Sequence, residues 1–153
     1  MLIQMLNAIM AVCVDDGLDS SQLRADIEKL LAYLPYFEVA DAELVCQWTE
    51  SKKTSEKNYT LPYPVYDEKL EQFVKAVYDS ELMISRYQDV IHQHGLHMGE
   101  NLMDTIHIAD LTLTRAILTA YIRQERFCDG LWQSAVEEKA FYRILLRLGD
   151  FIR

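Results

Sequence analysis

The stretch DLTLTRAILTAYIRQERFCDG, residues 110–130, decides the fold that we expect for this chain. Asp110 is a residue type that caps helix N-termini, and neither proline nor glycine interrupts the sequence before Gly130. At about 100° per residue, the apolar side chains fall on one side of such a helix. These are Leu113, Ile117, Ala120, Tyr121 and Phe127. The pattern predicts a long helix that ends near Cys128.

The other side of this predicted helix is polar. The same spacing places four residues opposite the core side and two on its flanks. Those opposite are Arg115, Thr119, Arg126 and Asp129, and those on the flanks are Arg123 and Glu125. Gln124 falls in the middle of the core side, where a long amide needs a buried hydrogen-bond partner.

Helical periodicity and capping residues recur along most of the chain. Apolar residues at helical spacing, with Ser, Asp and Gly at the ends, predict further helices. The first is expected at residues 2–14 with Gly17 as its cap, and the second from Ser20 or Ser21 to Pro35. A third follows the cap Asp67, and a fourth runs from the S-x-x-Q pair Ser85 and Gln88 to Gly95. The last two are expected at 99–108 and at 131–148, the latter straight or bent near Glu138. Residues 37–48 fit a helical face and also alternate as a strand would, and we expect a helix there.

Residues 49–66 form a polar loop followed by an extended segment. Residues 50–58 include no hydrophobic residue and are expected to be exposed. Pro62 and Pro64 exclude a helix from the segment LPYPVY, residues 61–66. The predicted fold class is therefore all-α: one helical domain over residues 1–153, a bundle of about six to eight helices that accommodates a small β-hairpin near residues 44–61.

The composition is typical of a soluble domain in a reducing compartment. The chain has 24 acidic and 15 basic residues, which gives a formal net charge of −9. This charge disfavours nucleic acid and anionic membranes as partners, and no basic recognition helix indicates a helix-turn-helix. Cys13, Cys46 and Cys128 are scattered without a C-x-x-C pair, as suits a cytoplasmic protein. The apolar start, residues 1–14, has no basic n-region, so we interpret it as a helix of the fold.

The residues that could carry chemistry predict no catalytic constellation, cofactor or metal site. His92, His94, His97 and His107 are close in sequence, but their spacing matches no metal template. Histidines near a helix C-terminus also complement its dipole. Cys128 stands beside acidic residues, which disfavour a reactive thiolate. The arginines near residue 125 either hold an anionic ligand or form ordinary surface ion pairs.

Three segments resemble a known family. They are LPYF at residues 34–37, LPYPVY at 61–66 before a helix, and IRQERFCDG at 122–130, where R-x-x-R-F-C-x-G is the most specific part. The chain resembles the prokaryotic domain-of-unknown-function family 6508 over most of residues 30–148. The resemblance implies a small cytoplasmic bacterial or archaeal protein with no assigned activity. The family pattern has an acidic residue, Asn or Asp, and Gly near Glu138, whereas this chain has EEKA, so the last two helices are expected to run together.

A site shared across that family would use residues from the matching segments. The resemblance gives Tyr63, Tyr66, Arg123, Arg126 and Asp129 as ligand-binding candidates, with Glu137 as the partner of an arginine. The structural alternative is a buried Arg126 that ties the turn at Gly130 to Glu137 and to the proline segment through its five donors.

Taken together, the residues favour an interaction module without enzymatic activity. The absence of a catalytic motif and the apolar first helix predict a cytoplasmic helical module that self-associates. The alternative is a sensor or enzyme for a small anionic ligand, with an Arg/Tyr pocket around Arg123, Arg126 and Tyr63.

Overall fold

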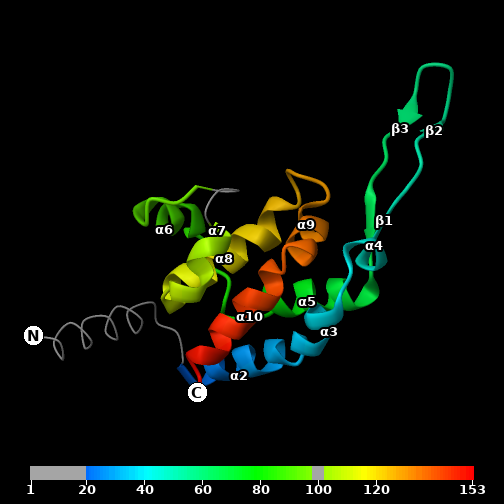
Figure 1. The fold of residues 1–153 in the computed structure, drawn as a ribbon. Coiled ribbons are helices and arrows are strands. Elements are labelled where there is room, and N and C mark those ends of the chain that lie inside the picture. The colour runs from blue at the N-terminus through cyan, green and yellow to red at the C-terminus, as the bar shows by residue number, and fades with distance from the viewer. Residues whose placement is uncertain (1–19, 98–101) are drawn as a thin grey trace, which may run out of the picture.

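The computed structural model describes residues 20–97 and 102–153. Its described part is mostly helical, with a β-hairpin that projects from the helical body (Figure 1). The predicted all-α class with a small hairpin is confirmed. The helix expected at residues 2–14 lies outside the described residues.

Helix α8 (Leu111–Gln124) occupies the centre of the body. The predicted cap is confirmed, because the Asp110 side chain accepts a hydrogen bond from the Leu113 N–H at 2.7 Å. Gln124 also has the partner that its position requires, since its Nε2 donates to the Tyr87 hydroxyl at 3.0 Å. The helix is shorter than expected, ending at Gln124 rather than near Cys128.

The expectation of a solvent-facing polar side on α8 is wrong for its first half. Arg115 and Thr119 are buried, with 4% and 0% of their surface exposed. Neighbouring backbone satisfies their polar groups: Arg115 donates to the carbonyls of Glu81 and Leu82, and Thr119 Oγ1 accepts from the Ile84 N–H. The segment before α6 (Tyr87–Gln93) covers this side of the helix, which the residues of α8 alone do not reveal.

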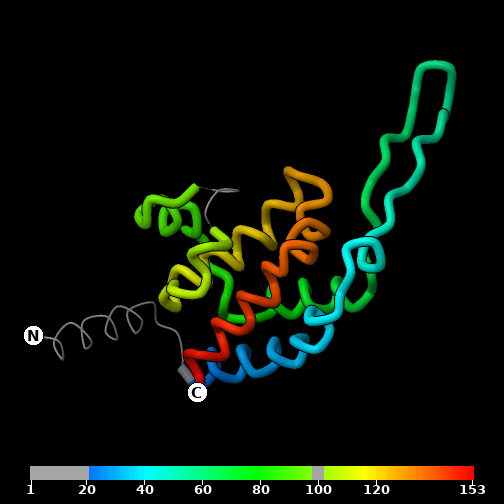
Figure 2. The backbone as a smooth tube through the Cα atoms, viewed as in Figure 1, coloured from blue at the N-terminus to red at the C-terminus, as the bar shows by residue number. Residues whose placement is uncertain are grey.

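Four helices enclose the core beside α8. These are α2 (Ser20–Leu31), α3 (Leu34–Val39), α5 (Glu68–Tyr78) and α10 (Ala140–Asp150). Phe37, Phe73 and Phe141 come from three of these helices and meet with ring centroids 4.7 to 5.4 Å apart. Such aromatic contacts stabilise beyond the area that they bury. Figure 2 shows α10 running through the body between α2 and α8.

The remaining helices are short. They are α4 (Ala42–Val45), α7 (Leu102–Thr105), the 3-10 turn η1 (Ile106–Ile108) and α9 (Leu131–Glu137). The expected single helix at 99–108 is thus two short elements in its described part. The last two helices do not run together, because Lys139 adopts a left-handed φ of 64° between α9 and α10.

Several predicted helix ends differ in detail. Pro35 lies in the first turn of α3 rather than stopping α2, which ends at Leu31. The pair Ser85 and Gln88 does not cap α6, whose N-cap Arg86 makes no side-chain cap bond. Gly95 closes α6 as expected, with φ +70°.

The hairpin, residues 46–66, is called the β arm below. At its base, β1 (Cys46–Trp48) pairs antiparallel with β4 (Pro64–Tyr66), and toward its tip β2 (Lys52–Lys53) pairs with β3 (Tyr59–Thr60). The single helix expected over residues 37–48 is therefore wrong. Extended backbone at Ala40 and Asp41 separates α3 from α4, and from Cys46 onward the alternating residues pair with β4 as a strand. No helix in the described residues is long and apolar enough to cross a bilayer.

Candidate functional site

The two faces of the β arm differ at its base. Backbone hydrogen bonds join Thr49 to Tyr63 and Asp67 to Val45, which fixes the alternation of the side chains between them. Tyr66 and Cys46 are at least half-buried toward the helical body. Val65 and Tyr63 therefore lie on the opposite face, where both are exposed.

Further exposed hydrophobic residues lie along the returning half of the arm, from β4 at the base to β3 near the tip. The fractions of surface exposed are 48% for Val65, 52% for Tyr63, 78% for Leu61 and 63% for Tyr59. We refer to these four residues as the exposed arm hydrophobics. Figure 1 shows the arm projecting from the helical body, with β2 and β3 at its outer end.

The outer edge of the returning strand is poor in backbone donors. Pro64 lies opposite Trp48 at a position that makes no ladder hydrogen bond, and its nitrogen carries no hydrogen. Pro62, two residues earlier, lacks a donor as well. A third strand would find few N–H groups here, so the arm offers a side-chain face rather than this edge for binding.

Glu125 anchors the arm to the helical body. Its carboxylate accepts hydrogen bonds from the Tyr66 hydroxyl and from the backbone N–H groups of Gly130 (2.9 Å) and Trp132 (2.8 Å). These N–H groups lie at the N-terminus of α9, where a negative charge is favoured. The Tyr66 and Trp132 rings also pack, with centroids 5.0 Å apart.

Trp48 forms the second anchor. Its Nε1 donates to Gln133 Oε1 at 2.9 Å, and Gln133 Nε2 donates in turn to the Ala42 carbonyl at 3.2 Å. The indole lies over Gly130, where an added Cβ would stand 2.8 Å from Trp48 Cζ2. Position 130 in the turn after α8 thus requires glycine for two reasons, the φ of +90° and the close contact with the indole.

Burial perturbs the titratable groups around these anchors. Burial, followed by the hydrogen bond to Glu125, raises the pKa of the Tyr66 hydroxyl above its usual value. Burial and the hydrogen bond to Asp67 do the same for the pKa of Tyr36. Burial first, and the Glu125 charge second, raise the pKa of the Cys46 thiol. These groups stay protonated at neutral pH and are poorly suited to nucleophilic chemistry.

The structure brings only part of the sequence-predicted site together. Tyr66 does meet the end of α8, but its partner there is Glu125 and not an arginine. Arg126 is exposed, with its guanidinium carbon 5.7 Å from the Phe127 ring centroid, and Arg123 is half-buried. Tyr63 lies on the arm, away from the face toward the body.

The acidic candidates are both exposed. Within the described residues, no ion pair joins Asp129 or Glu137 to an arginine. The alternative in which a buried Arg126 ties Gly130 to Glu137 does not occur either, and Glu125 holds that turn instead.

Sequence reasoning missed Glu125, although a signal for it existed. A carboxylate a few residues before a glycine that opens a helix can accept from the free N–H groups of that helix. The periodicity placed Glu125 on a flank of one long helix, which hid the start of α9 from view. The histidines form no metal site in the described part of the chain, where no group of three or more potential ligands gathers.

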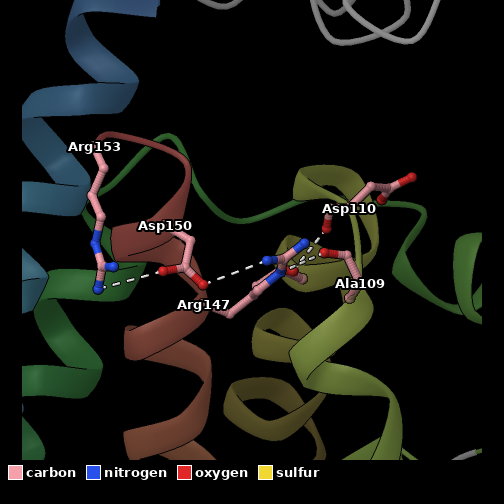
Figure 3. A network of polar contacts seen from close by, with 6 residues as sticks. Ala109, Asp110, Arg147, Asp150 and Arg153 are labelled. Atoms are coloured by element: carbon pink, nitrogen blue, oxygen red, sulfur yellow. Dashed lines mark hydrogen bonds and ion pairs between the residues drawn. The ribbon is translucent and has the colours of Figure 1, made fainter. Parts of the chain in front are cut away.

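A pocket of about 440 Å³ is lined by residues of α7, η1 and α10. Three nitrogen-bearing side chains line it, together with apolar residues and one carboxylate. The lining residues are His107, Arg143, Arg147, Met103, Ile106, Leu146 and Asp150. Figure 3 shows how Arg147 is held: its Nε donates to the Ala109 carbonyl at 2.8 Å and its Nη1 lies 3.4 Å from Asp150.

The model of a family of unknown function (DUF6508) matches residues 22–153. No curated protein and no solved structure matches the chain.

Proposed function

The chain belongs to the family of unknown function DUF6508, and from the surface of this member we propose that it is an interaction module. It binds another protein through the uncovered face of its β arm. The helical body supplies the rigid support, and the Glu125 and Trp48 anchors fix the direction in which the arm projects.

The concentration of exposed hydrophobic surface on and beside the arm carries this proposal. Seven of the eleven large hydrophobic side chains that are exposed in the described residues lie between residues 39 and 65. They are the four exposed arm hydrophobics, Val39 and Leu44 just before the arm, and the anchor Trp48, which faces the body and is 44% exposed. Scattered exposed hydrophobic residues are normal, but a contiguous set on a projecting element is typical of a binding surface. Aromatic residues are also enriched at protein interfaces.

Site-specific photo-crosslinking in cells tests this function. A photoreactive phenylalanine in place of Tyr63 should form a protein adduct, whereas the same residue in place of the exposed Gln88 on α6 should not. Leu61→Asp should abolish the adduct, because it places a charge among the exposed arm hydrophobics. Ser85→Asp, which adds the same charge at an exposed position outside the arm, is the matched control.

The two control positions decide the result. An adduct at Tyr63 that is lost with Leu61→Asp and kept with Ser85→Asp supports binding through the arm. The absence of an adduct at Tyr63, or an equal adduct at Gln88, would overturn it.

The pocket over α10 favours a second candidate function, the binding of a small anionic ligand. His107, Arg143 and Arg147 line it with a single carboxylate, Asp150, in a chain whose net charge is −9. Guanidinium groups suit phosphate and carboxylate geometry. The apolar lining residues favour a ligand that also has a hydrophobic part. This candidate moves the expected anion site away from Arg123 and Arg126.

Thermal-shift measurements with inorganic phosphate and nucleotides test the second candidate. A ligand at 100 times its Kd should stabilise the fold by about 2.7 kcal/mol. Arg143→Ala should remove the shift, because this exposed side chain lines the pocket. A shift that survives Arg143→Ala, or no shift in the wild type, argues against this pocket.

The cytoplasm is the compartment that we propose for this module. Cys46 and Cys128 are both free thiols, one buried and one exposed. Free exposed thiols persist in reducing compartments, which supports this location.

A further inference from the structure

We propose that the partner of the β arm is a second copy of this chain, with the two arms packed antiparallel about a twofold axis. This inference rests on the proposed function and names its partner. It is carried by the order of charged and apolar residues from the base of the arm to its tip.

The base of the arm is acidic. Glu38, Asp41 and Glu43 are exposed on the segment that leads into the arm. The Lys139 ammonium also lies here, held by the Phe37 and Glu38 carbonyls at 3.1 and 2.8 Å, and the segment remains net negative. Val39 and Leu44, the two most exposed hydrophobic residues of this segment, stand among the carboxylates.

The tip of the arm is basic. Lys52, Lys53 and Lys57 are exposed, and no described carboxylate lies within ion-pair distance of their ammonium groups. Residues 46–66 carry three lysines and two glutamates, hence +1, which leaves −10 for the rest of the chain from the total of −9. The exposed arm hydrophobics extend from the acidic base to the level of the tip lysines, where Tyr59 lies opposite Lys53.

This order selects an antiparallel arrangement of two arms. With the arms antiparallel, each tip lies beside the base of the partner copy, so lysines meet carboxylates and the exposed arm hydrophobics of both copies face each other. With the arms parallel, tips would meet tips and like charges would repel. The antiparallel contact is isologous, so it closes at two copies.

The strand edges favour contact through faces. Pro62 and Pro64 remove N–H donors from the returning strand, which opposes a continuous sheet through that edge. The arm is about 30 Å long and two strands, or about 10 Å, wide, so one face covers less area than the roughly 800 Å² that each partner buries in a standard interface. We therefore expect a weak, concentration-dependent dimer, to which Val39 and Leu44 add contact at each end.

Sedimentation velocity over a wide range of protein concentration tests the dimer. The wild type should pass from monomer to dimer, with weaker association at high salt. Leu61→Asp should raise the dissociation constant by about 100-fold, roughly tenfold for each of the two symmetric sites. Ser85→Asp, which adds the same charge at an exposed position outside the arm, should leave it within a few-fold of the wild type.

Charge reversal tests the antiparallel direction. A tip variant, Lys52→Glu with Lys53→Glu, and a base variant, Glu38→Lys with Glu43→Lys, should each fail to dimerise alone, because tip and base then repel. An equimolar mixture of the two should dimerise, because both tip-to-base contacts become attractive. Homodimers of either variant as tight as the wild type would overturn the antiparallel arrangement.

The outcome for the wild type separates this inference from the function on which it rests. A monomer at all concentrations overturns self-association, and an arm adduct to a different protein in the photo-crosslinking experiment would then still support the interaction module. A chain that stays monomeric and forms no adduct at Tyr63 overturns both the dimer and the proposed interaction module. Circular dichroism confirms that each exposed-site variant is folded.

Discussion

The Glu125 carboxylate receives hydrogen bonds from two places far apart in the chain. One donor is the Tyr66 hydroxyl on β4, and the others are the Gly130 and Trp132 N–H groups at the start of α9. A charged acceptor with several donors contributes more to stability than a neutral hydrogen bond does. This single side chain therefore couples the position of the arm to the turn that ends α8.

Replacing this carboxylate should be costly. Glu125→Ala leaves the Tyr66 hydroxyl and two helix N-terminal N–H groups without their acceptor, and we expect the free energy of unfolding to fall by about 3 kcal/mol. Glu137→Ala, which removes an exposed carboxylate from the same region, should change it by less than about 0.5 kcal/mol. Urea unfolding measures both, and equal effects would contradict the anchoring role.

The tyrosines near the arm base predict a stability loss at alkaline pH. The pKa values of Tyr36 and Tyr66 are raised in the folded state, so the folded chain keeps protons that the unfolded chain releases above its usual tyrosine pKa of about 10. Stability is therefore fully present below that pH and falls as pH rises above it, by at most about 1.4 kcal/mol per pH unit for each tyrosine.

Tyr66→Phe should reduce this alkaline slope. Phenylalanine cannot ionise, so the variant is less stable at neutral pH but loses less free energy of unfolding between pH 9 and 11, a window of about one unit around the usual tyrosine pKa. Chemical denaturation at several pH values gives the slope. An unchanged slope would show that the Tyr66 hydroxyl does not ionise differently in the two states.

Among the elements, the turn between α8 and α9 combines two requirements at one glycine. Gly130 has φ +90° and lies against the Trp48 indole, whereas Gly95 has φ +70° with no atom within 4 Å of an added Cβ. Gly130→Ala should therefore cost more than Gly95→Ala, by at least about 1 kcal/mol, because only the first adds a clash to the backbone strain.

Tryptophan fluorescence identifies the origin of that difference. Gly130→Ala should also shift the emission of Trp48, since the indole must move away from the new methyl group. Gly95→Ala should leave the spectrum unchanged. Equal losses of stability in the two variants would mean that Trp48 adapts without cost.

The elements also show which features the sequence could reveal. Asp110 and Gly95 act at helix ends through local geometry, and the Gln124 amide had to find a partner because of its place on the core side. Local rules predict such features. Arg115 and the strand at Cys46 depend on segments distant in sequence, the first on Glu81 and Leu82 and the second on β4, so periodicity within one element could not show them.

At the scale of the whole molecule, a closed helical body carries an open arm. The predicted exposure of residues 50–58 follows from their composition, and the small β-hairpin expected near residues 44–61 places them at its tip. The hairpin extends beyond that range, to Tyr66, because β1 pairs with β4 at its base. For the candidate site, the matching segments indicated that Tyr66 meets the end of α8. They did not indicate Glu125 as its partner, because that contact depends on where α8 stops.

Because the core lies in the helical body and not in the outer arm, we predict that the tip of the arm is dispensable for folding. The described side chains between residues 50 and 62 are all exposed, and none belongs to the core. Replacing residues 50–62 with Asn-Gly would join Thr49 and Tyr63, which already form a backbone hydrogen bond, through a turn suited to a two-residue hairpin loop. The free energy of unfolding should stay within about 1 kcal/mol, because shortening an exposed loop changes the closure entropy little.

The same shortened chain should lose every property assigned to the arm. It lacks Tyr59, Leu61 and the tip lysines, so the dimer seen by sedimentation and the adduct at Tyr63 should both disappear while circular dichroism and the melting temperature remain those of the wild type. Unfolding of the shortened chain would mean that the arm completes the core. A folded chain that still dimerises would place the interface on the helical body, because the anchors at Glu125 and Trp48 would then hold an arm that association does not need.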